Sequence, residues 1–465
     1  MKKIILLLAL FSSACLFAQD ITGPWYGLLS YPGGEFHITL NITKTPTGYS
    51  STMNLAEQKA KDVPLTTTTF VSNTLTFTLA KAGIEYKGEL LDNIFKGTFT
   101  QKNMPLELNF SREPIKTAEK AKRPQEPVKP YPYYEEEVTF KNEKAGITLA
   151  GTLTLPKKEG NYPAVILISG SGPQNRDEAL LGHKPFLVLS DYLTRNGIAV
   201  LRYDDRGIAG STGTFATAIT QDFATDAAAA LAYLKTRKEI NKNKIGLAGH
   251  SEGGIIAPIV ATENTGVAFL VLLAGTAIPG DELLMLQNYL ISKADGMPEE
   301  ELNKLGAINR KVYDIVKQEQ NTTVMKAKIN AEYSNELKPL LISKGIPQDQ
   351  VGPYLEMQAN ELASPWYVNF IRYNPFTTLE KVKCPILAIN GSNDVQVAAK
   401  ANLEAIKRAT AKSGNKKVTI KELPGLNHLF QQSATGAPAD YGTIEETFSP
   451  IALKEVLAWI QQQVK

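Results

Sequence analysis

The sequence predicts an α/β fold, in which a mostly parallel sheet is flanked by helices and carries an inserted helical cap, preceded by a small antiparallel all-β domain. Two observations lead to this prediction. Short runs that alternate between apolar and polar residues fill residues 20–112, whereas near-continuous apolar runs separated by helical stretches fill residues 134–465. Alternation is typical of strands with one solvated face, and continuous apolar runs are typical of parallel strands buried on both faces.

The chain begins with the layout of a secretory signal peptide. Lys2 and Lys3 precede an apolar run over residues 4–11, and small residues follow up to Ala18. This run is well short of the ~20 residues that span a bilayer, so a membrane anchor is not expected. We therefore predict that residues 1–18 are removed, and that the protein is exported to the periplasm or the cell exterior without a membrane span.

Composition argues against several partners. Cys15 would be the acylated residue of a lipoprotein, but Ser12 stands where such processing sites prefer a branched apolar residue, so lipid anchoring is not expected. Cys384 is then the single remaining cysteine, and it cannot form an internal disulfide. Loss of Lys2 and Lys3 lowers the formal net charge from +3 to +1, which leaves no basic excess for binding nucleic acid or anionic lipid.

Residues 20–112 are expected to fold as a meander of short strands. Three of the runs read EFHITLNIT, NTLTFTLA and IFKGTFTQ, and turn residues separate them. This segment shows no cluster of catalytic residue types. Residues 113–133 follow with many prolines and charges, which is the composition of an extended linker, so we place a domain boundary there.

Residues 134–465 are expected to form the catalytic domain. Its strand-like runs are PAVILISG, IAVLRYD, KIGLAGH, FLVLLAG, CPILAING and KVTIKELPG, with stretches of helical length between them. Strands that alternate with helices build a parallel sheet with helices on its faces. The strand signal stops over residues 276–378, which look mainly helical, and we predict that this segment is an inserted cap.

The stretch GLAGHSEGG places Ser251 in a G-x-S-x-G pattern. This pattern is weak alone, but here it follows an apolar strand over residues 244–248 and precedes GGIIAPIVA, which can start a helix. That is the strand–turn–helix setting of a nucleophile elbow, where Gly249 and Gly253 remove side chains that would clash in the turn. We predict that Ser251 is a nucleophile, and that the backbone amide of Glu252 points at the same space.

A serine nucleophile needs a base and an acid, which follow it in the chain order serine, acid, histidine. Of the four histidines, His37, His183, His250 and His428, only the last follows Ser251. It lies in a loop after a predicted strand, and we expect it to be the base. Asp394 follows the predicted strand over residues 385–389 and is the expected acid, since the other candidates lie in the cap or, like Asp440, after the histidine.

A second oxyanion donor is expected in the loop SGSGPQNRD, residues 169–177, which follows the strand VILIS. Its glycines let backbone amides turn toward the serine. We nominate the amide of Ser171, with that of Gly172 as the alternative. No metal or organic cofactor is implied by this chemistry.

Together these motifs resemble the α/β-hydrolase superfamily over residues 134–465. The segments GSGPQNRDE, HKPFLVLSDYL, LRYDDRGIAGSTG and GHSEGG resemble, in this order, bacterial secreted esterases of the serine aminopeptidase-type (S33-like) hydrolase group. Ser169 stands where many hydrolases have a His-Gly loop. By position, the resemblance implies that Ser251 is the nucleophile, Asp394 the acid and His428 the base. It also implies that the backbone amides of Ser171 and Glu252 form the oxyanion hole.

The resulting expectation is a carboxylesterase that cleaves short- to medium-chain acyl esters, of a small molecule or of an acylated carbohydrate, through an acyl-enzyme. Trp366, Tyr367 and Phe370 in the cap are the candidate substrate pocket. One alternative is an exopeptidase, with Glu356 or Glu361 holding the substrate ammonium. Another is a glycan- or envelope-binding protein whose β domain delivers a deacetylase-type esterase. The sequence leaves the natural substrate and the oligomeric state open.

Overall fold

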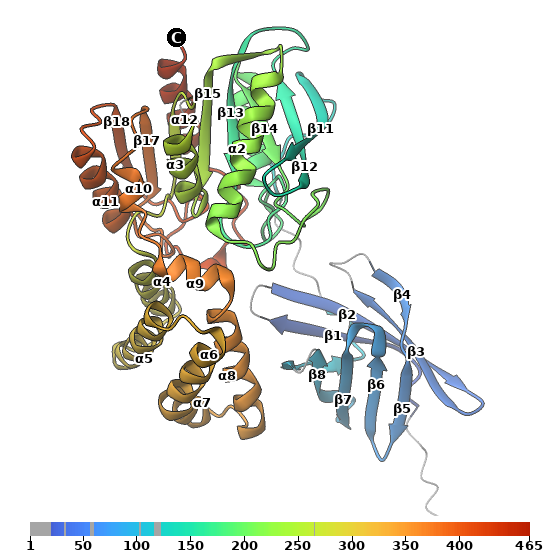
Figure 1. Cartoon of the computed structure of the whole chain (residues 1–465). Coiled ribbons are helices and arrows are strands. Elements are labelled where there is room, and N and C mark those ends of the chain that lie inside the picture. The colour runs from blue at the N-terminus through green and yellow to red at the C-terminus, as the bar shows by residue number, and fades with distance from the viewer. Residues whose placement is uncertain (1–19, 32–33, 56–59, 102–103, 116–121, 265) are drawn as a thin grey trace, which may run out of the picture. The chain divides into compact units, whose positions relative to one another are not determined.

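The computed structural model describes residues 20–465, except for 32–33, 56–59, 102–103, 116–121 and 265 (Figure 1). The chain divides into two compact units, Met1–Ala118 and Glu119–Lys465. The predicted signal peptide, residues 1–18 with Cys15, lies outside the described residues. Within the described residues, no helix has both the length and the apolar character needed to cross a membrane.

The first unit is an antiparallel sheet in the order β4-β3-β2-β1-β10-β8-β7-β6-β5, with β9 beside β8. Its two ends approach each other, because Ser51 on β3 and Thr68 on β5 share a hydrogen bond of 2.6 Å. Trp25, Phe77 and Phe95 pack in its core. Its strands are β1 (Gly23–Tyr31), β2 (Gly34–Thr45), β3 (Gly48–Leu55), β4 (Ala60–Pro64), β5 (Thr67–Val71), β6 (Thr74–Leu79), β7 (Ile84–Leu91), β8 (Ile94–Gln101), β9 (Met104–Glu107) and β10 (Phe110–Ser111).

The second unit contains an eight-stranded sheet in the order β11-β12-β14-β13-β15-β16-β17-β18. β11 and β12 are antiparallel, and the pairs from β14 to β18 are parallel. This is the predicted α/β-hydrolase fold. The strands are β11 (Tyr134–Asn142), β12 (Ile147–Leu155), β13 (Tyr162–Ile168), β14 (Ala199–Tyr203), β15 (Ile240–His250), β16 (Leu270–Leu273), β17 (Ile386–Gly391) and β18 (Val418–Leu423).

Helices cover both faces of this sheet (Figure 1). α1 (Pro185–Arg195) and α12 (Pro450–Gln463) pack on one face, together with Val165 and Leu167 of β13. α2 (Thr220–Thr236), α3 (Gly253–Glu263) and α11 (Ala399–Lys412) pack on the other, together with Ile166. Successive residues of one strand thus enter opposite cores, which is why the strands are apolar throughout.

A helical segment separates β16 from β17, in the stretch where the sequence predicts an inserted cap. Its helices are α4 (Gly280–Ala294), α5 (Glu299–Gln318), α6 (Thr322–Glu332), α7 (Lys338–Ser343), α8 (Gln348–Leu362), α9 (Pro365–Arg372) and α10 (Phe376–Leu379). The helix α9 contacts α2, which places this end of the cap beside the sheet domain.

The expectation that residues 113–133 form an extended linker is wrong for the second half of that segment. Arg123 donates hydrogen bonds to carbonyl oxygens of the loops at 181–182 and 442–444. Gln125 bonds both the amide and the carbonyl of Phe448, and Glu126 pairs with Lys184 at 2.8 Å. Composition alone could not reveal this, because the acceptors are backbone groups far away in the sequence.

Candidate active site

Ser251 lies on the tight turn between β15 and α3. It has a left-handed φ of 52°, a strained conformation for a residue with a side chain. The turn is closely packed: a Cβ at Gly249 would lie 2.0 Å from the carbonyl oxygen of Gly253, and a Cβ at Gly253 would lie 2.3 Å from that of Ile168. The backbone amide of Ser251 donates to Leu273 on β16 at 2.9 Å. The local structure is that of a nucleophile elbow.

Asp394 and His428 lie in direct contact after neighbouring strands. Asp394 follows β17 and His428 follows β18, so both sit at the carboxyl edge of the parallel sheet, where β15 also ends at His250. Nδ1 of His428 lies 2.8 Å from Oδ2 of Asp394, and both side chains are buried. The other carboxylate oxygen of Asp394 accepts the amides of Gln396 and Val397 at 2.8 Å each, which fixes its orientation.

The nucleophile turn and the histidine loop meet through His250. Nε2 of His250 lies 3.0 Å from the carbonyl oxygen of His428, and the two rings are 4.7 Å apart. Ser251 Oγ makes no hydrogen bond to His428 in the described part of the chain. Such catalytic hydrogen bonds are often long without substrate and tighten when it binds. The predicted acid and base are therefore already in contact, and His250 links the turn of Ser251 to the histidine loop.

Backbone amides that donate to no protein acceptor lie near Ser251. A Cβ at Gly170 would lie 3.1 Å from Cβ of Ser251, so the loop after β13 passes directly beside the serine. The amide of Gly170 is already used, because it donates to Glu178 at 2.8 Å. Among the described residues, the amides of Ser171, Gly172 and Glu252 donate to no protein acceptor. This suits the predicted oxyanion-hole role of Glu252 and of Ser171, and it suits Gly172, the alternative to Ser171, equally.

Glu178 is a site residue that sequence reasoning missed. One of its oxygens, Oε1, accepts both the amide of Gly170 and Nδ1 of His250, at 2.8 and 2.9 Å. The carboxylate is buried, and its own backbone has a left-handed φ of 50°. The motif GSGPQNRDE ends with this residue, so the signal was present, but the contact with His250 spans 72 positions.

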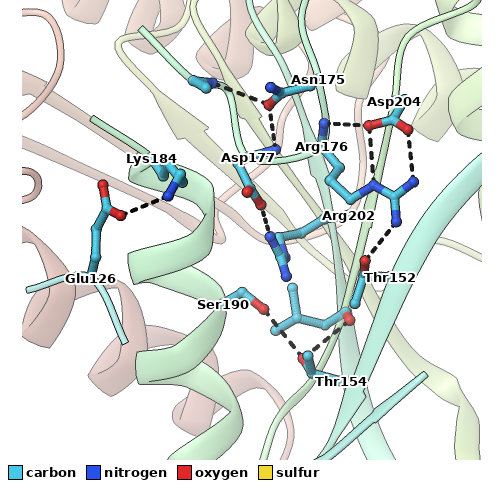
Figure 2. Close-up of polar contacts among 12 residues, drawn as sticks. Glu126, Thr152, Thr154, Asn175, Arg176, Asp177, Lys184, Ser190, Arg202 and Asp204 are labelled. Atoms are coloured by element: carbon cyan, nitrogen blue, oxygen red, sulfur yellow. Dashed lines mark hydrogen bonds and ion pairs between the residues drawn. The ribbon is translucent and has the colours of Figure 1, made fainter. Parts of the chain in front are cut away.

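Ion pairs brace the loop that contains Glu178 (Figure 2). The guanidinium of Arg176 binds both oxygens of Asp204, at 3.1 and 2.7 Å, and donates to Thr152 on β12 at 2.8 Å. Arg202 on β14 pairs with Asp177. A two-point guanidinium–carboxylate contact fixes orientation as well as distance, so this loop is held firmly against the sheet.

Two more buried carboxyl groups lie near the nucleophile. Asp205 accepts the Ser169 hydroxyl and the Gln174 amide at 2.9 Å each, and burial raises its pKa to about 7. Glu252 is 2% exposed, and burial raises its pKa to about 6. The described residues hold no group of three or more histidine, cysteine or acidic side chains that could bind a metal ion.

The residues predicted to line the substrate pocket lie on α9, and they differ in burial and in hydrogen bonding. Trp366 Nε1 donates to both oxygens of Glu252, at 3.0 and 3.1 Å, and its ring stacks on Phe370 at 4.9 Å. Phe370 is only 5% exposed, so its ring is mainly packing. Tyr367 is half-buried against Trp366. The helix α9 is thus bonded to the residue that follows Ser251.

A cavity lies elsewhere in the helical segment between β16 and β17. Its volume is about 770 Å³, and its lining includes Met285, Tyr289, Arg310 and Tyr333 from the helical segment between β16 and β17. None of the nominated pocket residues on α9 lines it. The sequence could not locate this cavity, because it depends on how several cap helices pack.

Comparison with known proteins now decides the family. Residues 145–422 match the family described as X-Pro dipeptidyl-peptidase (S15 family). The chain belongs to this family. The match covers Ser251 and Asp394 and ends before His428. The finer resemblance to the S33-like group is not confirmed, because the family that matches is S15.

Individual relatives of this S15 member carry esterase or hydrolase names. Esterase EstD of Thermotoga maritima is 26% identical over 296 residues, which cover 63% of this chain and 61% of EstD. The α/β-hydrolase GrgF from Penicillium is 18% identical, with a TM-score of 0.43 over 71% of this chain and 99% of GrgF. An esterase from Pyrococcus furiosus is 15% identical, with a TM-score of 0.41 over 71% of this chain and 93% of that structure.

Proposed function

We propose that the protein is a serine hydrolase that acts as a carboxylesterase on short- to medium-chain acyl esters. The observation that carries the proposal is the buried contact of 2.8 Å between His428 Nδ1 and Asp394, next to a serine on a left-handed turn. The carboxylate fixes the tautomer in which Nε2 is free to accept a proton, which is the state that a general base needs.

The mechanism follows from these groups. His428 takes the proton of Ser251 Oγ as this oxygen attacks the acyl carbon, and the imidazolium that forms is stabilised by Asp394. The amides of Ser171 and Glu252 stabilise the negative oxygen of the tetrahedral intermediate. His428 then protonates the departing alcohol, which leaves an acyl-enzyme on Ser251. Water, deprotonated by the same histidine, releases the acid.

A second candidate is an exopeptidase, because the matching family is described as a dipeptidyl-peptidase. The same triad chemistry cleaves amides. A dipeptidyl-peptidase must also bind the substrate ammonium, and the sequence offered Glu356 and Glu361 for this role. Both lie exposed on α8, where a carboxylate is ordinarily solvated. The name of EstD favours the ester over the peptide.

The test compares both substrate classes on the mature chain. We would measure hydrolysis of 4-nitrophenyl esters from acetate to laurate, beside aminoacyl and Xaa-Pro dipeptidyl 4-nitroanilides, with Ser251→Ala as the control. Ester turnover that disappears in S251A is expected, with a chain-length optimum that measures the acyl pocket. Faster anilide than ester cleavage would move the protein to the peptidases, and turnover that survives in S251A would refute the proposed nucleophile.

We also propose that the protein is exported, with cleavage after Ala18. Lys2, Lys3 and the short apolar run over residues 4–11 support this proposal. An acylated carbohydrate outside the cell would then be a suitable ester substrate. Expression of the whole gene should give an extracytoplasmic protein whose first residue is Gln19, and a cytoplasmic protein that keeps Met1 would contradict the proposal.

A further inference from the structure

Behind the triad lies a second carboxylate–histidine pair that the mechanism does not use. We propose that Glu178 and His250 form a buried carboxylate–imidazolium pair that positions His428 and keeps its ring neutral, ready to accept the serine proton. Both would be positioning residues, since they act through His428. The proposal rests on the proposed function, in which His428 is the base.

The proton inventory of His250 carries the argument. Its two ring nitrogens both face acceptors, because Nδ1 lies 2.9 Å from Oε1 of Glu178 and Nε2 lies 3.0 Å from the carbonyl oxygen of His428. A carbonyl oxygen can only accept, so Nε2 must carry a hydrogen. A neutral imidazole has only one N–H, so with that hydrogen on Nε2 its Nδ1 has none to donate to Glu178. The contact between Nδ1 and Oε1 therefore needs a second proton, either on the ring of His250 or on the carboxyl group of Glu178.

The surroundings of Glu178 place that second proton on the ring. Oε1 also accepts the amide of Gly170 at 2.8 Å, and an ionised carboxylate oxygen accepts such a bond more strongly than the hydroxyl oxygen of a protonated carboxyl would. Burial favours the neutral imidazole, but the charge of Glu178 and its hydrogen bond outweigh it and raise the pKa of His250. The charged groups that face His250 are Glu178 and Asp394, and Asp205 adds a further acid near Glu178.

The pair acts on the base in two ways. The Nε2 hydrogen bond holds the backbone of His428 in place, and the amide bond of Gly170 to the same carboxylate holds the loop that presents Ser171. The cationic ring of His250 also lies 4.7 Å from the ring of His428. Its charge opposes protonation of His428, whereas Asp394 favours it. The carboxylate of Glu178 binds the opposite ring nitrogen, farther from His428, so the imidazolium has the larger effect.

Histidine NMR tests the pair without relying on turnover. The chain has four histidines, so ¹⁵N spectra of the imidazole groups can be followed one by one in the full mature protein. In the wild type we expect His250 to carry protons on both nitrogens from pH 5 to pH 8. His183 is an internal reference, because burial lowers its pKa. A singly protonated His250 in folded wild-type protein at pH 7 would overturn the proposal.

Glu178→Gln then separates charge from shape. The amide keeps the size of the side chain and one acceptor oxygen, but a neutral His250 can donate to only one of its two partners. We expect His250 to lose its second proton, and the titration midpoint of His428 and the acid limb of kcat/KM to rise together by at least about 0.5 pH unit. The matched control is E404Q, which removes the same charge at an exposed residue of α11 and should move neither value.

The outcomes separate the two proposals. An unchanged His428 midpoint in folded E178Q would refute the electrostatic role of the pair, even if kcat falls through misplacement. If S251A keeps full ester hydrolysis, the proposed function fails, yet the NMR state of His250 still decides whether the pair exists. Should E178Q not fold, the wild-type spectra and the effect of His250→Gln on the His428 midpoint remain as tests.

Discussion

Asp394, the proposed acid, contacts a single ring nitrogen of His428, so its loss should affect the chemistry more than substrate binding. Asp394→Asn keeps the shape but would donate toward Nδ1 of His428, which favours the tautomer that cannot accept the serine proton. We expect kcat for a 4-nitrophenyl ester to fall by about 10³–10⁴ with little change in KM. D349N, an exposed aspartate on α8, is the control and should keep the wild-type rate. A loss below tenfold in D394N would count against the assigned acid.

Asp205 makes stability depend on pH in a defined direction. Burial raises its pKa from 3.8 to about 7, although Gln174 and Ser169 donate to it. Between these values the folded chain holds a proton that the unfolded chain has lost, so stability falls as pH rises, by at most about 4 kcal/mol above pH 7. D205N removes this charge. Its unfolding temperature should exceed that of the wild type at pH 8, and the difference should shrink toward pH 4. A difference that is equal at all pH values would contradict this cause.

The junction of β15 and α3 leaves no space for a side chain at Gly249. A Cβ there would lie 2.0 Å from the carbonyl oxygen of Gly253, a backbone atom that cannot move without opening the turn. G249A should therefore abolish ester hydrolysis and lower the unfolding temperature. G306A is the matched control, because Gly306 is partly exposed on α5 and its Cβ would meet only the end of Met285 at 3.9 Å. Equal activity of G249A and G306A would show that the turn can relax.

The turn between β15 and α3 could be predicted from the sequence, whereas the contact between Glu178 and His250 could not. The elbow is local: a strand, two glycines and a helix start occupy neighbouring positions, so its geometry follows from residue type. The order of serine, acid and histidine also follows from one sheet topology. Glu178 reaches His250 only after the loop following β13 folds back over the nucleophile turn. The motif GSGPQNRDE marks the loop of Glu178, but it does not indicate that His250 is the partner.

The same reasoning holds for the two units of the whole chain. Alternating and continuous apolar runs separated an all-β segment from an α/β segment, because the two kinds of sheet bury different numbers of faces. The prediction of an extended linker over residues 113–133 was wrong in part. Prolines and charges are common in free linkers, but they are also common in irregular segments that side-chain contacts hold against a domain. Arg123, whose hydrogen-bond acceptors lie on two loops, is the residue that turns one half of this segment into part of the second unit.

Arg123→Ala should therefore weaken the second unit without affecting the first. The guanidinium donates to carbonyl oxygens of Leu181, Gly442 and Ile444 at 3.1, 2.8 and 2.7 Å, and each hydrogen bond to a charged group contributes about 1.5–3 kcal/mol. We expect a lower temperature of half-inactivation for ester hydrolysis. R112A is the control, because Arg112 donates to Pro24 and covers Trp25 within the first unit. R112A should lower the melting temperature of the β domain and leave the temperature of half-inactivation unchanged. If R112A inactivates the enzyme as readily as R123A, the two units do not unfold independently.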